Sequence, residues 1–339
     1  MLVPDLRREV RGELGGGGHG LGGRGLVHRV PINRSHGPAG PPIGGWLGVM
    51  ADPLYCWPAA MPDQTQPDLA SLRVEIDRID DALHDLLMRR ADIVAQMAAS
   101  RVKAGAPSFR PGREAQILRR LLERNQGALA RGTVVRLWRE IIASSLAQQG
   151  AFSVAVPGEA AADSPLVRLA RAHFGLPTPL KLHATPSRTL ASVADGEAAV
   201  AVLPAPQEGD RPEAAWWAQM EPSRLRVVLA LPFLAPNGAP NGNGGAPAYA
   251  VAPLAPEPTG RDRSLLRLEP GPEHSRARIQ AALTAAGLTP RWLLRQETPT
   301  PMALAELDGF LTEQDPRLAA LPFPRMQILG AYAEPEPEE

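Results

Sequence analysis

Residues 69–97 place apolar side chains at alternating spacings of three and four, and this pattern constrains the fold more than any other part of the sequence. The stripe consists of Leu69, Leu72, Ile76, Ile79, Leu83, Leu86, Arg90, Ile93 and Met97. Such spacing puts one face of an α-helix against other helices at a shallow angle. Nothing interrupts it before Gly105 and Pro107. We therefore expect a long helix of about nine turns.

Two shorter helices are predicted after the long one. The first begins after Pro111 and Gly112, ends near Gly127, and directs inward Ile117, Leu118, Leu121 and Leu122. The second takes Thr133 as its N-cap and ends at Gly150. Its inward stripe consists of Val134, Leu137, Trp138, Ile141, Ile142, Ser145, Leu146 and Gln149. These three helices make a thin bundle, and because a single chain would leave much of the long seam bare, the pattern implies a dimer.

After Gly150 the pattern becomes α/β. We predict strands at residues 152–156, 180–183, 198–203, 226–231 and 249–252, and helices at residues 164–174 and around Leu190 and Val193. Residues 235–248 contain Asn-Gly repeats and are predicted to form a flexible loop. A final unit is expected to contain four strands, at residues 264–268, 291–295, 303–310 and 326–329, and one helix, at residues 275–286. The acidic tail, residues 334–339, is expected to be frayed.

Residues 1–67 form a glycine- and proline-rich extension that we expect to be disordered, because such a segment cannot bury enough apolar surface to offset its ordering entropy. Its glycine run at residues 15–18 is not followed by the Gly-Lys-Ser/Thr of a phosphate-binding loop. Met50 or Met61 is an alternative start of the translated chain. The expected organisation is this extension, a helical domain at 68–150, an α/β region at 151–260, an α+β region at 261–333 and the tail.

Composition excludes several classes of function. The 36 basic and 36 acidic residues leave no net charge, which argues against a general nucleic-acid binder. Cys56 is the only cysteine, so neither an intrachain disulfide nor a cysteine-rich metal site can form, and a reducing, cytoplasmic setting is expected. No apolar run approaches the ~20 residues that span a bilayer. We therefore expect no metal, no nucleic acid and no membrane partner.

Arg90 is the chemically informative anomaly, because it places a cation on the apolar seam of the long helix. A buried, unpaired charge costs on the order of several kcal/mol, so an anion should compensate it. The side chains that could line a pocket with it are Arg73 and Arg101 on the same helix, Arg113 and Glu114 on the second, and Ser145 and Gln149 on the third. Any one arginine alone would be expected to reach solvent or to pair with Asp77, Asp80 or Asp85, but the joint placement favours a cationic pocket.

This set of residues resembles the all-helical class of chorismate mutases. The matching stretches are Leu72-Arg73 with Ile76 and Asp80, then Arg89-Arg90, Arg113-Glu114, and Ile141-Ile142 through Ser145 to Gln149. The resemblance covers about a quarter of the chain. It implies an intertwined homodimer in which the long helix of one subunit supplies Arg73 to the other subunit's site.

The resemblance also implies a reaction, the rearrangement of chorismate to prephenate in phenylalanine and tyrosine biosynthesis, with no cofactor. Arg73 of the partner and Arg90 would clamp the two carboxylates of the substrate, with Ser145 assisting. A cation and Gln149 would donate to the ether oxygen, and Glu114 would accept from the ring hydroxyl, with Arg113 nearby. The apolar walls of the pocket would be Met97, Ile117, Ile142 and Leu146.

Two positions depart from the family's pattern. The cation aimed at the ether oxygen is usually a lysine, whereas the spacing from Arg90 puts Arg101 there. Lys103 is an alternative, but two positions along a helix point it about 200° away. Arg110 stands where an aspartate is common before the second helix, which affects how the hydroxyl is recognised rather than the reaction.

The rest of the chain is weakly similar to prephenate dehydratases at residues 154–175, 198–209 and 261–266, and its final unit resembles the ACT domain that ends those enzymes. The catalytic signatures differ. Pro204-Ala205-Pro206-Gln207 replaces Pro-Ile-Glu-Asn, and Asp262-Arg263-Ser264 replaces Thr-Arg-Phe. Since an aspartate cannot supply the hydroxyl that protonates the leaving water, we expect a degenerate module retained for structure or for binding.

Three other functions are compatible with the sequence. An isochorismate pyruvate lyase shares the helical fold and a nearly identical pocket, although the continuous Arg113-Glu114 helix start favours the mutase. A bifunctional chorismate mutase/prephenate dehydratase would require an active C-terminal region. A helical dimerisation module joined to a sensor domain would not be an enzyme, and it would leave Arg90 unexplained.

Overall fold

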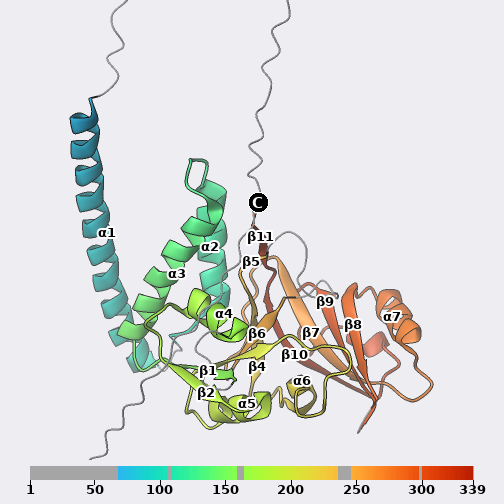
Figure 1. Ribbon diagram of the computed structural model, residues 1–339. Helices are drawn as coiled ribbons and strands as arrows, with labels where there is room; N and C mark the ends of the chain where they lie inside the picture. Colours follow the sequence, from blue (N-terminus) through green and yellow to red (C-terminus); the bar gives the residue numbers. More distant parts are fainter. Residues whose placement is uncertain (1–67, 105–107, 159–163, 236–245, 298–299, 339) are drawn as a thin grey trace, which may run out of the picture. The chain divides into compact units, whose positions relative to one another are not determined.

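The computed structural model describes residues 68–104, 108–158, 164–235, 246–297 and 300–338. Three helices open this part of the chain, α1 (Leu69–Ala104), α2 (Pro111–Arg124) and α3 (Arg131–Gln148) (Figure 1). The three predicted helices are thereby confirmed, followed by the predicted α/β region. The predicted N-cap of the third helix, Thr133, is wrong, because the observed N-cap is Ala130, three residues earlier, with no side-chain cap. The predicted disordered extension, residues 1–67, lies outside the described residues, as does most of the predicted loop, 236–245.

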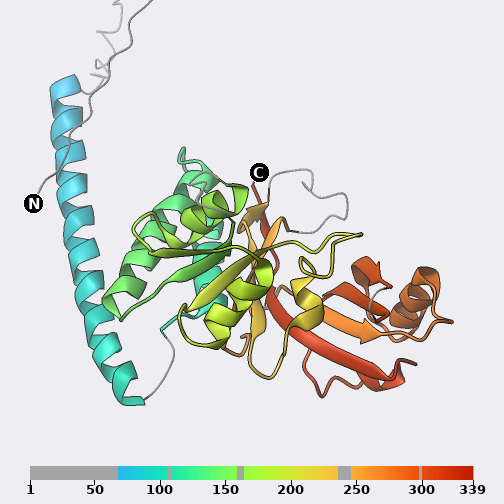
Figure 2. The ribbon, with the colours of Figure 1, turned by 60° about the horizontal axis from the view of Figure 1, so that its bottom comes forward.

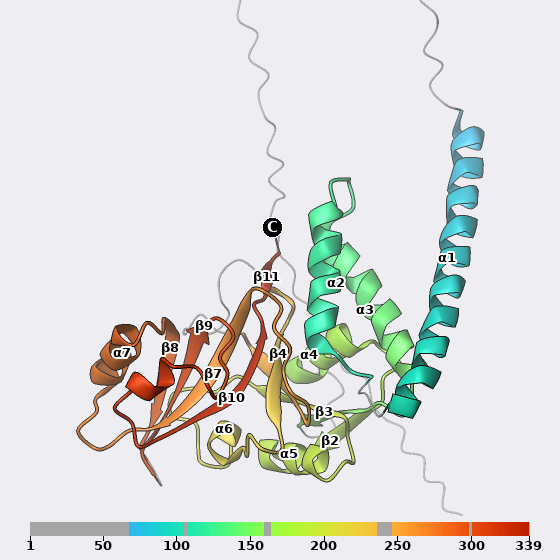
Figure 3. The ribbon, with the colours of Figure 1, turned by 180° about the vertical axis from the view of Figure 1, so that it is seen from behind.

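Helix α1 leaves its apolar seam largely uncovered. Leu69 is 70% exposed, Leu86 62% and Met97 46%, although all three lie on the predicted stripe. Only its C-terminal part runs beside α3, which the three ribbon views show consistently (Figures 1, 2 and 3). The sequence predicts this exposure for a single chain. The dimer that would cover the seam stays a prediction.

One nine-stranded sheet runs through the α/β region, in the order β2-β1-β3-β6-β4-β10-β7-β9-β8. Its strands are β1 (Val154–Pro157), β2 (Leu180–His183), β3 (Val200–Pro204), β4 (Arg226–Leu231), β6 (Ala248–Ala252), β7 (Asp262–Glu269), β8 (Pro290–Gln296), β9 (Met302–Asp308) and β10 (Arg325–Ala333). β1 pairs in parallel with β2 and β3, whereas β6 pairs antiparallel with β3 and β4. All the strands predicted from the sequence are present, with ends shifted by a few residues.

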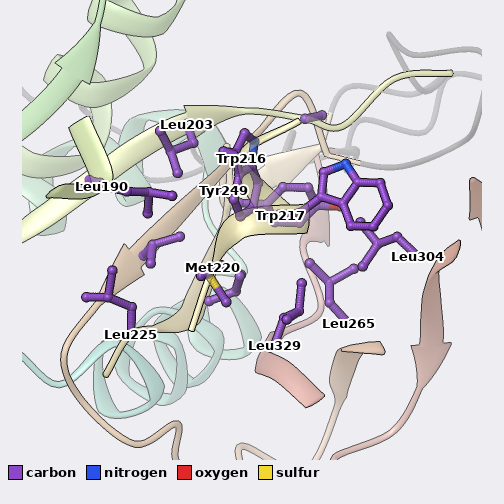
Figure 4. Close-up of a cluster of buried hydrophobic side chains, with 14 of the residues drawn as sticks. Leu190, Leu203, Trp216, Trp217, Met220, Leu225, Tyr249, Leu265, Leu304 and Leu329 are labelled. Carbon is purple, nitrogen blue, oxygen red and sulfur yellow. The ribbon is translucent and has the colours of Figure 1, made fainter. Parts of the chain in front are cut away.

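Alternate residues of the first strands build two apolar layers, one on each face of the sheet. Val154 and Val156 pack with Phe174 of α4 (Pro165–Phe174), whereas Ala155 packs with Leu190 of α5 (Pro186–Ala194). The α5 layer continues across α6 (Trp216–Gln219), a helix that the sequence did not predict, and its side chains meet those of β4, β7 and β10 (Figure 4). This period of two is what a strand buried on both faces requires.

Strands β7 to β10 make up the second part of the nine-stranded sheet, in the antiparallel order β10-β7-β9-β8, together with one helix, α7 (Arg276–Ala285). A short 3-10 helix (Leu318–Ala320) stands between β9 and β10. This second part is joined to the first part of the sheet where Gly330 of β10 pairs in parallel with Val227 of β4. Gly330 has a φ of +156°, and a Cβ there would lie 2.0 Å from the carbonyl oxygen of Val227, so only glycine fits the joint.

The acidic tail is ordered, and the expectation that it is frayed was wrong. β11 (Glu336–Pro337) pairs in parallel with β5 (Leu234–Ala235), so the last described residues form a second, two-stranded sheet. The buried carboxylate of Glu336 accepts hydrogen bonds from Arg119 of α2, at 2.5 Å, and from Arg261. Burial alone would raise the pKa of Glu336, but the two guanidinium groups outweigh it and hold the pKa below its ordinary value. Ion pairing therefore fixes a segment whose charge and lack of apolar residues suggested disorder.

Replacing this carboxylate gives a pH-dependent stability prediction. Glu336→Gln is expected to lower the free energy of unfolding at pH 7 by ~1–3 kcal/mol, because two guanidinium groups lose a charged partner. A carboxyl whose pKa is depressed by folding stabilises above its unfolded value and loses that contribution as the pH falls through the folded value. The difference in melting temperature between wild type and variant should therefore shrink below about pH 4. Glu338→Gln, at an exposed carboxylate two residues away, is the control and should show little difference at any pH.

Candidate active site

Arg90, on the apolar seam of α1, is hydrogen-bonded to α3. Nη1 of Arg90 donates to Oγ of Ser145 at 2.6 Å, and the same hydroxyl donates to the carbonyl oxygen of Ile141 at 2.7 Å. This fixes the direction of the hydroxyl, leaving its lone pairs for the guanidinium. Partial burial lowers the pKa of Arg90, yet an arginine remains charged. One turn further along α3, Nε2 of Gln149 donates to the carbonyl oxygen of Ser145 at 2.8 Å. Three of the predicted site residues thus lie together where α1 passes the end of α3.

Glu114 has a different partner in the single chain. Its Oε2 accepts from Nη1 of Arg139 at 2.9 Å, and both side chains are buried between α2 and α3. Burial raises the pKa of Glu114 while the neighbouring Arg139 lowers it, and burial likewise lowers the pKa of Arg139. The predicted role of Glu114 as acceptor of a substrate hydroxyl is untested, and the ion pair fixes the position from which it would act.

Sequence reasoning missed Arg139. It is 3% exposed and stands on the inward face of α3 together with Val135, Ile142 and Leu146. The signal was present, since positions 135, 139, 142 and 146 repeat the spacing of four, three and four that singled out Arg90. An arginine on an apolar stripe needs a partner within the fold, and Glu114 on the neighbouring helix supplies it.

The other predicted site residues are not gathered in one chain. Arg73 and Arg113 are exposed, on α1 and α2 respectively. Arg101 lies in α1, and its side chain is outside the described part of the structure. The predicted apolar walls also differ in exposure, because Met97 is exposed and Ile117 half-buried, whereas Ile142 and Leu146 are buried.

Arg110, at the family's aspartate position, is directed towards the α/β region. Its Nη2 donates to Oε1 of Glu257 at 2.6 Å, and Nε of the same guanidinium donates to that oxygen at 3.1 Å. Both side chains remain partly exposed, so the pair contributes little to stability. It holds the guanidinium of Arg110 against the segment before β7.

Asp262 and Ser264, which stand where the sequence comparison expects a dehydratase signature, are bonded to neighbouring backbone groups. Asp262 accepts hydrogen bonds from the backbone N–H of Thr259 at 2.8 Å, its hydroxyl at 2.6 Å, and the N–H of Gly260 at 3.1 Å. The buried hydroxyl of Ser264 donates to the carbonyl oxygen of Gly309 and accepts from the N–H of Leu311. Both side chains are thereby engaged by backbone groups and a neighbouring threonine, which supports a structural role for this segment.

Within the described ranges, no cluster of three or more histidine, cysteine, aspartate or glutamate side chains could hold a metal ion. Within the same ranges, no helix combines the length and apolar character needed to cross a bilayer.

Comparison with known proteins finds a family model that matches the helical segment. Residues 72–150 match the model of the family Chorismate mutase type II. A bifunctional chorismate mutase/prephenate dehydratase of Stutzerimonas stutzeri is 38% identical over 112 residues, which are 32% of this chain and 30% of that protein. A protein of the same description from Pseudomonas aeruginosa is 38% identical over 103 residues, 29% of this chain and 28% of that protein. The matches therefore cover less than a third of these curated relatives.

Solved structures resemble the chain more distantly. The structure described as GqqA, a novel type of quorum quenching acylases, shares 20% sequence identity with a TM-score of 0.39, covering 55% of this chain and 96% of that one. Prephenate dehydratase from Streptococcus mutans shares 13% identity with a TM-score of 0.38, covering 54% of this chain and 98% of that one. Likeness at this level carries no argument about activity.

Proposed function

We propose that the helical domain at residues 68–150 is a chorismate mutase, converting chorismate to prephenate without a cofactor. The observation that carries the proposal is the contact between Arg90 on the seam of α1 and Ser145 on α3, inside the segment that matches the mutase family. A guanidinium held against an oriented hydroxyl on an otherwise apolar stripe is suited to binding a carboxylate. Sequence identity to bifunctional mutase/dehydratases supports the same chemistry.

For this reaction the protein needs only to position the substrate and to stabilise its negative charge. Chorismate is a dianion, and its rearrangement is intramolecular, with one carbon–oxygen bond breaking as one carbon–carbon bond forms. No nucleophile, redox group or proton transfer is needed. The protein must hold the compact conformer and stabilise the negative charge that develops on the ether oxygen. A pocket of guanidinium groups with a few neutral donors performs both tasks.

Each side chain then has a proposed role. Arg90, assisted by Ser145, binds one carboxylate through charge-assisted hydrogen bonds, and Arg73 of a second subunit binds the other. Arg101 and Gln149 donate to the ether oxygen. Glu114, held by Arg139, accepts from the ring hydroxyl, with Arg113 beside it, and the walls are Met97, Ile117, Ile142 and Leu146.

A homodimer is part of this proposal. The exposed seam of α1 is long and apolar, and soluble chains seldom leave such a stripe to water. In a two-fold dimer the same stripe covers its copy, which brings Arg73 of each chain towards the site of the other. We further propose that the enzyme acts in the cytoplasm, in the biosynthesis of aromatic amino acids. The region after Gly150 is proposed to be a degenerate dehydratase-like and ACT-like module.

A polar substitution on the seam should weaken the dimer. Leu83 is 52% exposed in the single chain. In the proposed two-fold dimer each subunit would bury its own Leu83, so one substitution affects two contacts. Leu83→Gln is expected to raise the dimer dissociation constant by ~100-fold, since each lost leucine contact contributes ~1.5 kcal/mol or more. Sedimentation equilibrium measures the constant. Val74→Gln, at an exposed apolar position off the seam, is the matched control and should leave it unchanged.

Following the absorbance of chorismate with purified full-length chain tests the function itself. Chorismate should disappear and prephenate accumulate, whereas isochorismate should yield no pyruvate and prephenate no phenylpyruvate at neutral pH. Release of pyruvate from isochorismate would instead assign the lyase, and formation of phenylpyruvate would make the chain bifunctional. A chain inert towards chorismate would contradict the proposal.

A further inference from the structure

A cationic pocket is lined by the N-terminal half of α3, and neither Arg90 nor Ser145 is among its lining residues. It has a volume of about 420 Å³ and is formed by the first turns of α3, one face of α4 and the segment at residues 232–234. Its polar lining includes Arg131, Arg136, Arg139 and His173. Arg139 is paired with Glu114 through Nη1, and none of the four side chains otherwise has a role in the proposed mutase chemistry.

Several nitrogen atoms of side chains that line this pocket are buried without a partner. Among the described residues, neither Nε nor Nη2 of Arg139 has a hydrogen-bond partner, although Nη1 is paired with Glu114. Nε2 of His173, a side chain only 6% exposed, and Nε of Arg131 are likewise without one in the described ranges. Buried polar atoms are normally satisfied, so a cluster of them around one cavity indicates a missing acceptor.

The charge around the pocket is positive. Arg131, Arg136 and Arg139 contribute three guanidinium groups, and the negative charge of Glu114 is already engaged by one of them. Glu338 is the one carboxylate among the lining residues, and it is exposed. Burial, together with the neighbouring Arg139, lowers the pKa of His173 well below its ordinary value, so the imidazole is neutral at pH 7. A neutral imidazole beside unpaired guanidinium donors leaves the excess positive charge for an anionic ligand.

The remaining walls are apolar and would not suit a fully hydrated ion. They are contributed by Val135, Leu169, Ala172, Pro232, Phe233 and Leu234. The guanidinium carbon of Arg139 lies 5.4 Å from the centre of the Phe233 ring, so the cation lies over an aromatic face that also lines the pocket. The volume falls within the range of small-molecule sites, which combine apolar walls with a few convergent polar groups.

We propose that this pocket binds a small organic acid, with its carboxylate on Arg139 and Arg136 and a compact apolar body against Phe233 and Leu169. The carboxylate supplies the acceptor that the buried donors of Arg139 lack, and a planar carboxylate matches the fork of a guanidinium. The apolar body displaces water from the surface between α3 and α4. The site is separate from the proposed mutase pocket, and its existence does not depend on that activity.

Titration calorimetry with the full-length chain and 3-phenylpropanoate as probe tests the proposal. One equivalent of the probe should bind per chain, and its neutral amide should bind at least about tenfold more weakly, because the charge-assisted bonds are lost. Arg136→Gln, at an exposed position, should weaken binding about fivefold, and Ala172→Trp, at the exposed rim, should abolish it. Arg120→Gln, exposed on α2 and outside the pocket, is the control and should change nothing.

Other variants distinguish this pocket from the mutase site. His173→Phe keeps an aromatic ring in the core but removes the unpaired nitrogen, and it should weaken binding, whereas Arg90→Ala should not. Circular dichroism checks that each variant is folded. Absence of binding at 10 mM probe, about the weakest binding worth assigning to a site, would overturn the proposal. So would equal affinity for inorganic phosphate, equal affinity for the amide, or affinity that only Arg90→Ala reduces.

Discussion

Replacing Arg90 by alanine is expected to lower kcat/KM for prephenate formation by a factor of ~1000. The guanidinium is half-buried on an apolar seam and bonded to Ser145, so water cannot replace its contact with a substrate carboxylate. Truncating one partner of such a desolvated charge pair costs ~4 kcal/mol, and each ~1.4 kcal/mol is a factor of ten. Steady-state measurement of chorismate consumption gives the ratio directly.

Two further variants make this result specific. Arg78→Ala removes an exposed guanidinium of the same helix, one paired with Glu75 at 3.0 Å, and should leave kcat/KM within about twofold. Arg90→Lys keeps the charge but not the planar fork, and it should recover only part of the rate. Helix content and dimer dissociation constant should match wild type in all three variants. Near-normal turnover in folded Arg90→Ala would mean that Arg90 does not bind substrate.

Removing one member of the buried pair between Glu114 and Arg139 is expected to destabilise the protein strongly. Arg139→Ala leaves the buried carboxylate of Glu114 without its cation, and Glu114→Ala leaves a buried guanidinium without its anion. Breaking a buried ion pair from one side costs ~3–5 kcal/mol. For a chain of this size that corresponds to a melting temperature lower by ~10 °C. Differential scanning calorimetry provides the measurement.

The double variant separates the charge effect from packing. Glu114→Leu combined with Arg139→Met fills similar volumes and leaves no charge behind, so its melting temperature should lie close to that of wild type. Arg120→Ala, an exposed arginine of α2, should shift the melting temperature by no more than ~1–2 °C. If Arg139→Ala alone were as stable as Arg120→Ala, the pair would not be buried in solution.

The helical domain was largely predictable because its elements are specified locally. An uninterrupted three–four repeat of apolar residues fixes α1, and the proline that starts α2 fits a first helical turn. The same periodicity marked Arg90 as a cation out of place, and Ser145 as a residue on the facing stripe. Each of these signals lies within a single helix, the longest of which has 36 residues, so no knowledge of distant contacts was needed.

What escaped prediction depends on residues far apart in the sequence. The tail is fixed by the bonds of Glu336 to Arg119 and Arg261, which nothing in the tail itself reveals. The pairing of Arg139 with Glu114 likewise depends on how α2 packs against α3. The helical pattern and the family resemblance both proposed Arg73 and Arg113 for the site, but both side chains are exposed in the single chain, and their role stays a prediction.

The sheet that crosses Gly330 has a mechanical consequence for any signal that reaches the C-terminal region. A lobe joined to its neighbour through a flexible linker can swing, and ligands can act by opening or closing the gap. Here one sheet continues from β2 to β8, and its two parts are joined by the pairing of Gly330 with Val227 rather than by a linker. Bending the sheet there would break that pairing, at a position where only glycine fits. A ligand held against this sheet would therefore be sensed through the helices packed on it, not through a hinge within it.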